Sequence, residues 1–198
     1  MSHLEPWVDY APLAIIAAAL VWGLARIFYL LLAQNVAVLS LVSQRKNLAE
    51  YGLALVAVFS NVYLLLRPFV PVVDEWGFRQ TSPAPMLALF IMAFSMGLMI
   101  HCQIRMGKAW RIGVPETRQE SQSLVTGGIY TLSRNPIYSA VLLYLAGITL
   151  LLPGPFTVLC LVGSFLLLRP VIAREEAFME TAFGDEFRLY KQRVRRWI

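Results

Sequence analysis

Residues 137–173 consist of two apolar runs joined by only two residues: IYSAVLLYLAGITLLL (137–152), Pro153-Gly154, and PFTVLCLVGSFLLLRPVIA (155–173). A membrane-spanning helix needs about 20 mostly apolar residues, since each residue adds about 1.5 Å of length. The second run fits that length, whereas the first, with 16 residues, is short for a span. Because Pro153-Gly154 cannot carry the chain far from the membrane, the two runs predict a tight hairpin of helices.

Three further apolar runs precede the hairpin, at about 12–33, 48–69 and 85–104. Apolar residues make up 58% of the 198-residue chain and charged residues only 15%, with a mean hydropathy of +0.62. Soluble domains average about 45–50% apolar and about 25% charged residues, and disordered chains are less apolar still. The composition excludes a disordered chain and argues strongly against a soluble one. We predict an all-α integral membrane protein with about five transmembrane helices.

The segments between the apolar runs alternate in net charge. Segments 1–11 and 70–84 are acidic overall, whereas the basic segments are 34–47, 105–136 and 174–198. Cytoplasmic loops of membrane proteins carry the excess of Lys and Arg. The alternation therefore predicts a multi-pass protein with its N-terminus outside the cytoplasm and its C-terminus in the cytosol. The polar segments 101–136 and 169–198, where almost all potential chemistry lies, are then cytosolic.

The other bulk features exclude some partners. The net charge of +5 does not indicate nucleic-acid binding, because the basic residues follow the loop rule and form no long run. His101, Cys102 and Cys160 are too few for a metal site, so we expect no metal. The acidic N-terminus lacks the basic region of a cleaved signal peptide, and we expect the first apolar run to be kept as a span.

The C-terminal stretch has the spacing of a helix. Its apolar residues recur at steps of three or four, and they are Met179, Phe183, Phe187, Tyr190 and Val194. Gly184-Asp185 is suited to end one helix and begin the next. We predict a cytosolic amphipathic helix that docks on the protein or, as the alternative, lies in the membrane interface.

Two polar segments are candidates for ligand binding. Gly127-Gly128 lets the backbone approach a ligand closely. Arg134-Asn135-Pro136 precedes the fourth apolar run, where Pro136 suits the first turn of a helix and Asn135 its N-cap. Free N–H groups there, with the Arg134 guanidinium, could hold a carboxylate or ribose oxygen. The alternative is a capped helix beside an ordinary turn.

Glu175-Glu176 follows the fifth apolar run. On a helix two adjacent side chains point about 100° apart, so one carboxylate can face inward while the other pairs outward. An inward carboxylate could bind an ammonium group or ribose hydroxyls. The alternative is an interfacial ion pair with Arg174 or with a loop cation.

Three arginines, Arg26, Arg67 and Arg169, lie within or near the apolar runs. A charge inside the membrane is costly and suggests function, although each of these is near enough to an end to snorkel. Arg169, followed by Pro170, is expected to point toward the glutamate pair.

The order of the motifs in the second half of the chain is characteristic. They are MGKAWR (106–111), LVTGGIY (124–130), SRNPIY (133–138), EE (175–176) and FGDEFRLY (183–190). With the hairpin between the third and fourth, this set resembles the isoprenylcysteine carboxyl methyltransferase family and its relatives, the phospholipid N-methyltransferases. The resemblance covers about residues 100–197. Asn135 stands where the family has His, and Phe187 where it has Tyr.

The resemblance implies an integral membrane enzyme that uses S-adenosylmethionine and a lipophilic, membrane-partitioned acceptor. It implies a single membrane domain, 1–198, with an N-terminal two-helix part (1–84) and a catalytic part (85–198). The expected cofactor contacts are Val125, Gly127, Gly128, Ile129, Tyr130, Arg134, Asn135, Pro136, Tyr138, Glu175 and Glu176. The expected substrate contacts are Trp110, Arg111 and Arg26, and we expect catalytic roles for Arg111 and Arg169.

Several acceptors remain open. A prenylcysteine-type carboxylate is already a nucleophile and needs no base, so a lipophilic carboxylate or another lipid-like acceptor comes first. A phosphatidylethanolamine-type amine must first lose a proton, and the sequence shows no clear base for it. A small thiol is a further alternative. A non-catalytic lipid-binding or scaffold protein is the alternative from a different class.

Overall fold

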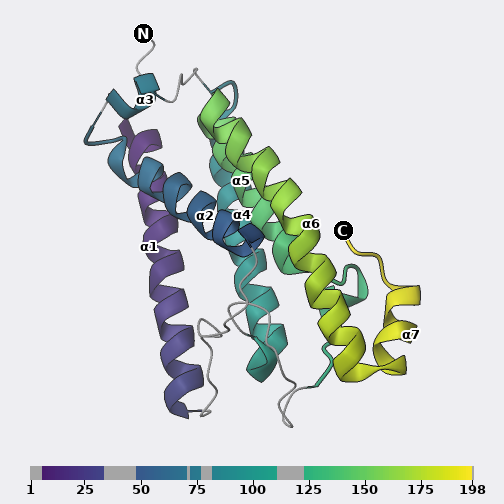
Figure 1. The fold of residues 1–198 in the computed structure, drawn as a ribbon. Coiled ribbons are helices and arrows are strands. Elements are labelled where there is room, and N and C mark those ends of the chain that lie inside the picture. The colour runs from purple at the N-terminus through teal and green to yellow at the C-terminus, as the bar shows by residue number, and fades with distance from the viewer. Residues whose placement is uncertain (1–5, 34–47, 71, 77–81, 111–122, 198) are drawn as a thin grey trace.

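The computed structural model describes residues 6–33, 48–70, 72–76, 82–110 and 123–197 (Figure 1). These residues form helices and connecting turns, with no strand among them. In chain order the elements are α1 (Pro6–Phe28), η1 (Tyr29–Ala33), α2 (Leu48–Leu66), α3 (Val72–Trp76), α4 (Pro85–Met106), η3 (Gly107–Ala109), η4 (Gly128–Thr131), α5 (Pro136–Leu151), α6 (Pro155–Phe183) and α7 (Asp185–Arg193). The predicted all-α class is confirmed.

Within the described residues, 4 helices are long and apolar enough to cross a membrane, and they match four of the predicted runs. The segments are Asp9–Leu32, Leu48–Leu66, Pro85–Ala109 and Pro155–Phe183. The fifth, α5, has 16 residues, about 24 Å of helix against a hydrocarbon core of about 30 Å. The chain is a multi-pass membrane protein, and the count of five spans stays a prediction.

The core lies where α5 packs on α4. Figure 1 shows these helices between α1 and α6, with α7 folded back beside the end of α6. Ala88 and Met92 of α4 are fully buried against Ile148 of α5. Gly147 brings the two helices together, because a Cβ there would lie 2.7 Å from Met92 Cγ and 3.2 Å from the Ala88 carbonyl oxygen.

This close approach predicts that Gly147→Ala destabilises the protein, although alanine is the better helix former. Overpacking a well-filled core costs about 1–3 kcal/mol, whereas the helix-propensity gain is at most about 1 kcal/mol. Thermal unfolding in detergent should show a lower midpoint for this variant. Gly163→Ala on α6 is the matched control, because its Cβ would meet nothing within 4 Å. Equal midpoints for the two variants would contradict the close contact.

The hairpin has the predicted tight turn, and its second helix extends beyond the apolar run. Thr157 Oγ1 donates to the Leu152 carbonyl at 2.8 Å and to that of Gly154 at 3.0 Å, which fixes the turn. α6 continues past Ala173 to Phe183, since no helix breaker follows before Gly184. Gly184 has a φ of 54°, a left-handed conformation that suits glycine, and α7 begins at the next residue.

Arg67, one of the charges inside an apolar run, is explained by an ion-pair cluster at the α3 end of the molecule. Its guanidinium lies 2.9 Å from Asp9 and 3.2 Å from Asp74. Tyr63 also donates a hydrogen bond to Asp74, at 2.9 Å. The two carboxylate partners come from α1 and α3, so Arg67, which directly follows α2, joins the three elements.

Candidate active site

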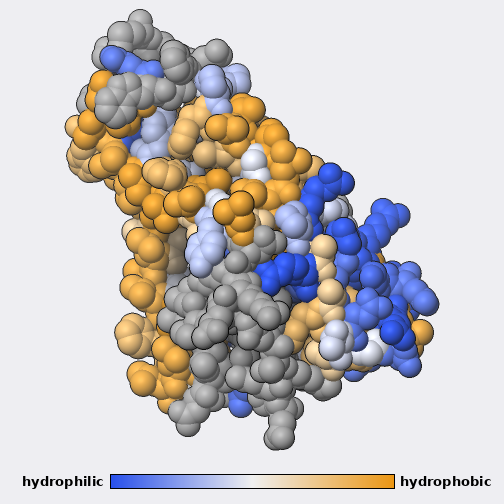
Figure 2. Space-filling view, viewed as in Figure 1, coloured by the Kyte–Doolittle hydropathy of each residue, from blue (hydrophilic) through white to orange (hydrophobic). Residues whose placement is uncertain are grey.

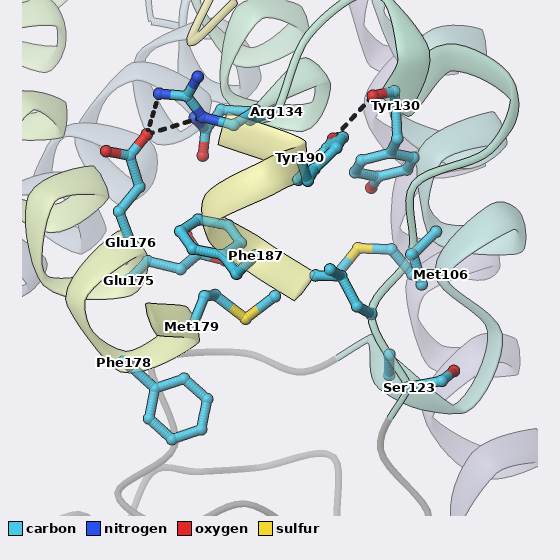
Figure 3. A pocket seen from close by; sticks show the side chains of 14 residues that line it. Met106, Ser123, Tyr130, Arg134, Glu175, Glu176, Phe178, Met179, Phe187 and Tyr190 are labelled. Carbon is cyan, nitrogen blue, oxygen red and sulfur yellow. Dashed lines mark hydrogen bonds and ion pairs between the residues drawn. The ribbon is translucent and has the colours of Figure 1, made fainter. Parts of the chain in front are cut away.

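A pocket lies where the end of α4, the segment before α5, the last turns of α6 and α7 come together (Figure 3). Its lining residues are Met106, Ala109, Ser123, Leu124, Val125, Tyr130, Arg134, Asn135, Glu175, Glu176, Phe178, Met179, Phe187 and Tyr190. The charged groups come from the chain just before α5 and from α6, and α7 adds the hydroxyl of Tyr190. Apolar and aromatic side chains form much of the remaining wall, the composition expected of a small-molecule site.

Glu176 is the centre of a buried charge cluster. One of its oxygens accepts from Arg134 Nη2 at 2.8 Å and Nε at 3.2 Å, and the other accepts from Arg196 Nη2 at 2.6 Å. The side chains of Glu176 and Arg134 are only 7% and 9% exposed. One carboxylate thus faces two guanidinium groups, and the cluster carries a net positive charge.

The last turn of α7 and the chain that follows it hold this cluster in place; we call residues 191–197 the C-terminal strap. The Arg134 N–H donates to the Arg195 carbonyl at 2.8 Å. The Arg134 guanidinium donates to the carbonyls of Lys191, at 3.1 Å, and Val194. The Asn135 amide donates to the Arg196 carbonyl at 3.2 Å. These hydrogen bonds satisfy the carbonyl groups of the strap and also orient the Arg134 side chain.

Glu175 differs from its neighbour in its partners. Its Oε2 accepts a hydrogen bond from the Tyr138 hydroxyl at 2.9 Å. Among the described residues no lysine or arginine lies within ion-pair distance of it, whereas Arg174 pairs with Glu50 at 2.6 Å. The two adjacent glutamates therefore line one pocket in different charge environments.

Tyr130 has a buried hydroxyl that no hydrogen-bond partner satisfies among the described residues. The residue is 6% exposed, and its backbone carbonyl accepts from the Tyr190 hydroxyl at 2.7 Å (Figure 3). Burial raises the pKa of Tyr190 to about 12 and also raises the pKa of Tyr130. Both phenols are therefore protonated near neutral pH, and Tyr130 has a free donor in the pocket wall.

Six of the expected cofactor contacts line the pocket: Val125, Tyr130, Arg134, Asn135, Glu175 and Glu176. Tyr138 acts through Glu175, and Pro136 occupies the first turn of α5 as expected. Asn135 is at the N-cap position, but its side chain makes no capping bond and binds the strap instead. The roles of these residues stay predictions.

The glycine pair and Ile129 lie outside the pocket lining. Gly128 has a φ of 64°, and a Cβ there would lie 2.8 Å from Arg105 Nε. The close approach that the glycines permit is therefore to the Arg105 side chain. Sequence reasoning also missed residues of the apolar wall. Met179, Phe187 and Tyr190 had the right spacing, and we interpreted them only as a docking face.

The expected substrate and catalytic residues are dispersed. Arg26 on α1 donates to the carbonyls of Gln103 and Gly107 at 3.0 Å each, so it caps the end of α4. Trp110 is buried in a cluster that contains Leu30. Arg169 is exposed over the ring of Phe165, and the structure does not bring it to the pocket. Arg111 lies outside the described residues.

The fold is that of a membrane protein with a pocket at the end of its helices. Comparison with known proteins shows the family to which the chain belongs. The chain belongs to the phospholipid methyltransferase family, whose model matches residues 84–186, just over half of the 198 residues. The match includes α4, the hairpin and both pocket glutamates. The predicted family relationship is confirmed.

A solved structure of the eukaryotic intramembrane Ras methyltransferase ICMT (isoprenylcysteine carboxyl methyltransferase) has a similar fold. The TM-score is 0.57 at 21% identity, over 78% of this chain and 54% of that one. The chain thus spans about half the length of that methyltransferase. An uncharacterized protein of Haemophilus influenzae is 43% identical over 63 residues, which are 31% of this chain and all of that protein.

Proposed function

We propose that the pocket binds S-adenosylmethionine and that the protein transfers its methyl group to a lipophilic acceptor from the bilayer. The observation that carries this proposal is that the two glutamates have different charged neighbours. The cluster of Glu176, Arg134 and Arg196 is net positive and suits a carboxylate. Glu175 has no cation beside it among the described residues and suits an ammonium group. A pocket with both features fits the zwitterionic amino-acid end of the cofactor.

The other lining residues fit the rest of the cofactor. Phe178, Met179 and Phe187 offer apolar surface to a flat adenine ring. When bound, S-adenosylmethionine supplies an electrophilic methyl group on a positively charged sulfur. The apolar wall excludes water, and exclusion of water favours a reaction that disperses this charge. The protein's part is to bind, orient and desolvate the reactants.

The position of the pocket along α6 supports access both from water and from the lipid bilayer. Glu175 is 20 residues beyond Pro155, about 30 Å along α6 and thus about one hydrocarbon thickness away. The pocket therefore lies near a membrane–water boundary, where a polar cofactor can enter from water and a lipophilic acceptor from lipid. The positive charge of the connecting segments favours the cytosolic side for this boundary.

Tyr130→Phe provides a test in which the stability of the free protein and the affinity for the cofactor should change in opposite directions. In the free protein, removing an unpartnered buried hydroxyl should leave stability unchanged or raise it by up to about 1 kcal/mol. If the hydroxyl binds the ligand, cofactor affinity should fall by roughly 2- to 10-fold, the value of one hydrogen bond. Thermal unfolding and calorimetry measure the two quantities. A destabilised variant with unchanged affinity would contradict this role.

Transfer of a radiolabelled methyl group tests the proposed reaction. Purified protein in nanodiscs is mixed with labelled S-adenosylmethionine and, in separate reactions, an S-prenylated cysteine carboxylate, phosphatidylethanolamine or an alkyl thiol. We expect label in the lipid phase with one acceptor class, and none with the Glu175→Gln variant. A protein that binds the cofactor but labels none of the three acceptors would contradict the proposed acceptor range. Label that persists in the variant would contradict the site.

A further inference from the structure

The lipid-facing side of α6 ends at a defined point. Its exposed apolar residues, 44–70% accessible, recur with helical spacing and are Val158, Leu159, Val162, Phe165 and Leu166. The next exposed position on this side, Arg169, carries a charge. Because a charge is costly in the hydrocarbon core, Arg169 marks the point on α6 from which a long side chain can reach the headgroup layer.

The C-terminal strap returns to this boundary. The Trp197 ring lies 6.1 Å from the Phe165 ring, and the Arg169 guanidinium lies 6.0 Å from the same ring. Figure 1 shows the C-terminus beside α6, well back from the turn between α6 and α7. Trp and Arg are the residues that favour the headgroup layer of a bilayer. The strap therefore runs along the membrane surface.

The basic residues at this surface fall into two groups. Arg188 is paired with Glu180 and Asp185, and Arg196 with Glu176. Three further exposed arginines, Arg169, Arg193 and Arg195, have no carboxylate partner among the described residues. Figure 2 shows hydrophilic residues over α7, directly beside the hydrophobic surface over α6.

We propose that Arg169, Arg193 and Arg195, with Trp197, form a binding surface for the headgroups of anionic lipids. Each unpaired arginine at such a surface strengthens the preference for anionic over zwitterionic lipid by about fivefold. The strap that carries this surface also contacts the pocket, because the Arg195 carbonyl accepts from the Arg134 N–H at 2.8 Å. The surface depends on the membrane placement of α6 and not on the proposed methyl transfer.

Brominated lipids test this directly, because a bromine near the strap quenches tryptophan fluorescence. The full chain is placed in nanodiscs that hold equal fractions of brominated phosphatidylglycerol or brominated phosphatidylcholine. The chain has other tryptophans, so the contribution of Trp197 is the part of the quenching that is lost in the Trp197→Phe variant. We expect the phosphatidylglycerol to quench Trp197 many-fold more effectively, and the preference to fall to near unity in an Arg169→Gln/Arg193→Gln/Arg195→Gln triple variant.

Arg188→Gln is the matched control, because this arginine is exposed but already held by two carboxylates. It should retain the preference for the anionic lipid. Equal quenching by the two lipids in the wild type, or a preference that survives the triple variant, would overturn the proposal. Loss of the preference in the control as well would show a general charge effect and would overturn it too. None of these readouts depends on methyl transfer.

Discussion

Glu175→Gln should abolish most of the affinity for S-adenosylmethionine and leave the fold intact. Glutamine has the shape of glutamate, and its amide oxygen can still accept the Tyr138 hydrogen bond, which is 2.9 Å long in the wild type. What is lost is the charge that faces the ligand's cationic group. Removing one member of a buried charge pair costs about 2–5 kcal/mol, which weakens binding roughly 30-fold or more.

Calorimetry and thermal unfolding, run on the same preparations, separate the two effects. The free energy of unfolding of Glu175→Gln should change by less than about 1 kcal/mol, since no hydrogen bond of the free protein disappears. Glu180→Gln, on the same helix but with its carboxylate directed to Arg188 and Lys191, should bind the ligand normally. If Glu175→Gln bound as tightly as Glu180→Gln, the carboxylate would have no part in binding.

Glu176→Gln is the second large effect, and it should lower stability as well as affinity. Its carboxylate compensates Arg134, whose side chain is 9% exposed, and also binds Arg196. Breaking a buried ion pair by neutralising one partner costs about 3–5 kcal/mol, because the remaining charge is left buried without compensation. The strap loses its Arg196 contact at the same time.

Denaturant unfolding in detergent measures this loss. Glu180→Gln again provides the comparison, since exposed ion pairs contribute only about 0–1 kcal/mol. In the double variant Glu176→Gln/Arg134→Gln the buried charge is gone, so part of the lost stability should return. If the unfolding midpoint of Glu176→Gln shifted as little as that of Glu180→Gln, the cluster would not contribute to stability.

Much of the fold could be predicted because membrane spans leave direct marks in the sequence. The long apolar runs, the Pro153-Gly154 turn and the break at Gly184 are each set by residues that are adjacent in the sequence. The structure confirms the turn and the break. The end of α6 was harder, because an apolar run ends where the hydrocarbon ends, whereas a helix ends where a breaker stands. That is why α6 extends ten residues beyond Ala173, to Phe183.

The candidate site was partly predictable. Arg134 and both glutamates were predicted from the polar segments that flank the hairpin, and they do meet in one pocket. The sequence could not distinguish the two glutamates, since their difference arises from Tyr138 and Arg196, which lie far from them along the chain. The strap was missed because its bonds use backbone carbonyl groups, which carry no residue-specific signal.

The arginines in the apolar runs show the same limit. Arg26 and Arg169 are both charges near a span end, and the sequence pattern favoured Arg169 as the one that points toward the glutamate pair. The structure directs Arg26 to the carbonyls at the end of α4 and leaves Arg169 on the lipid-facing side of α6. The partner of a long side chain is set by tertiary packing.

The most direct test of the central claim is calorimetric titration of the purified full chain in lipid nanodiscs with S-adenosylmethionine and with its demethylated product. The account predicts saturable micromolar binding of both ligands, and a loss of at least roughly 30-fold in Glu175→Gln. Folded protein that binds neither ligand, in nanodiscs and in detergent, would contradict a cofactor site in this pocket.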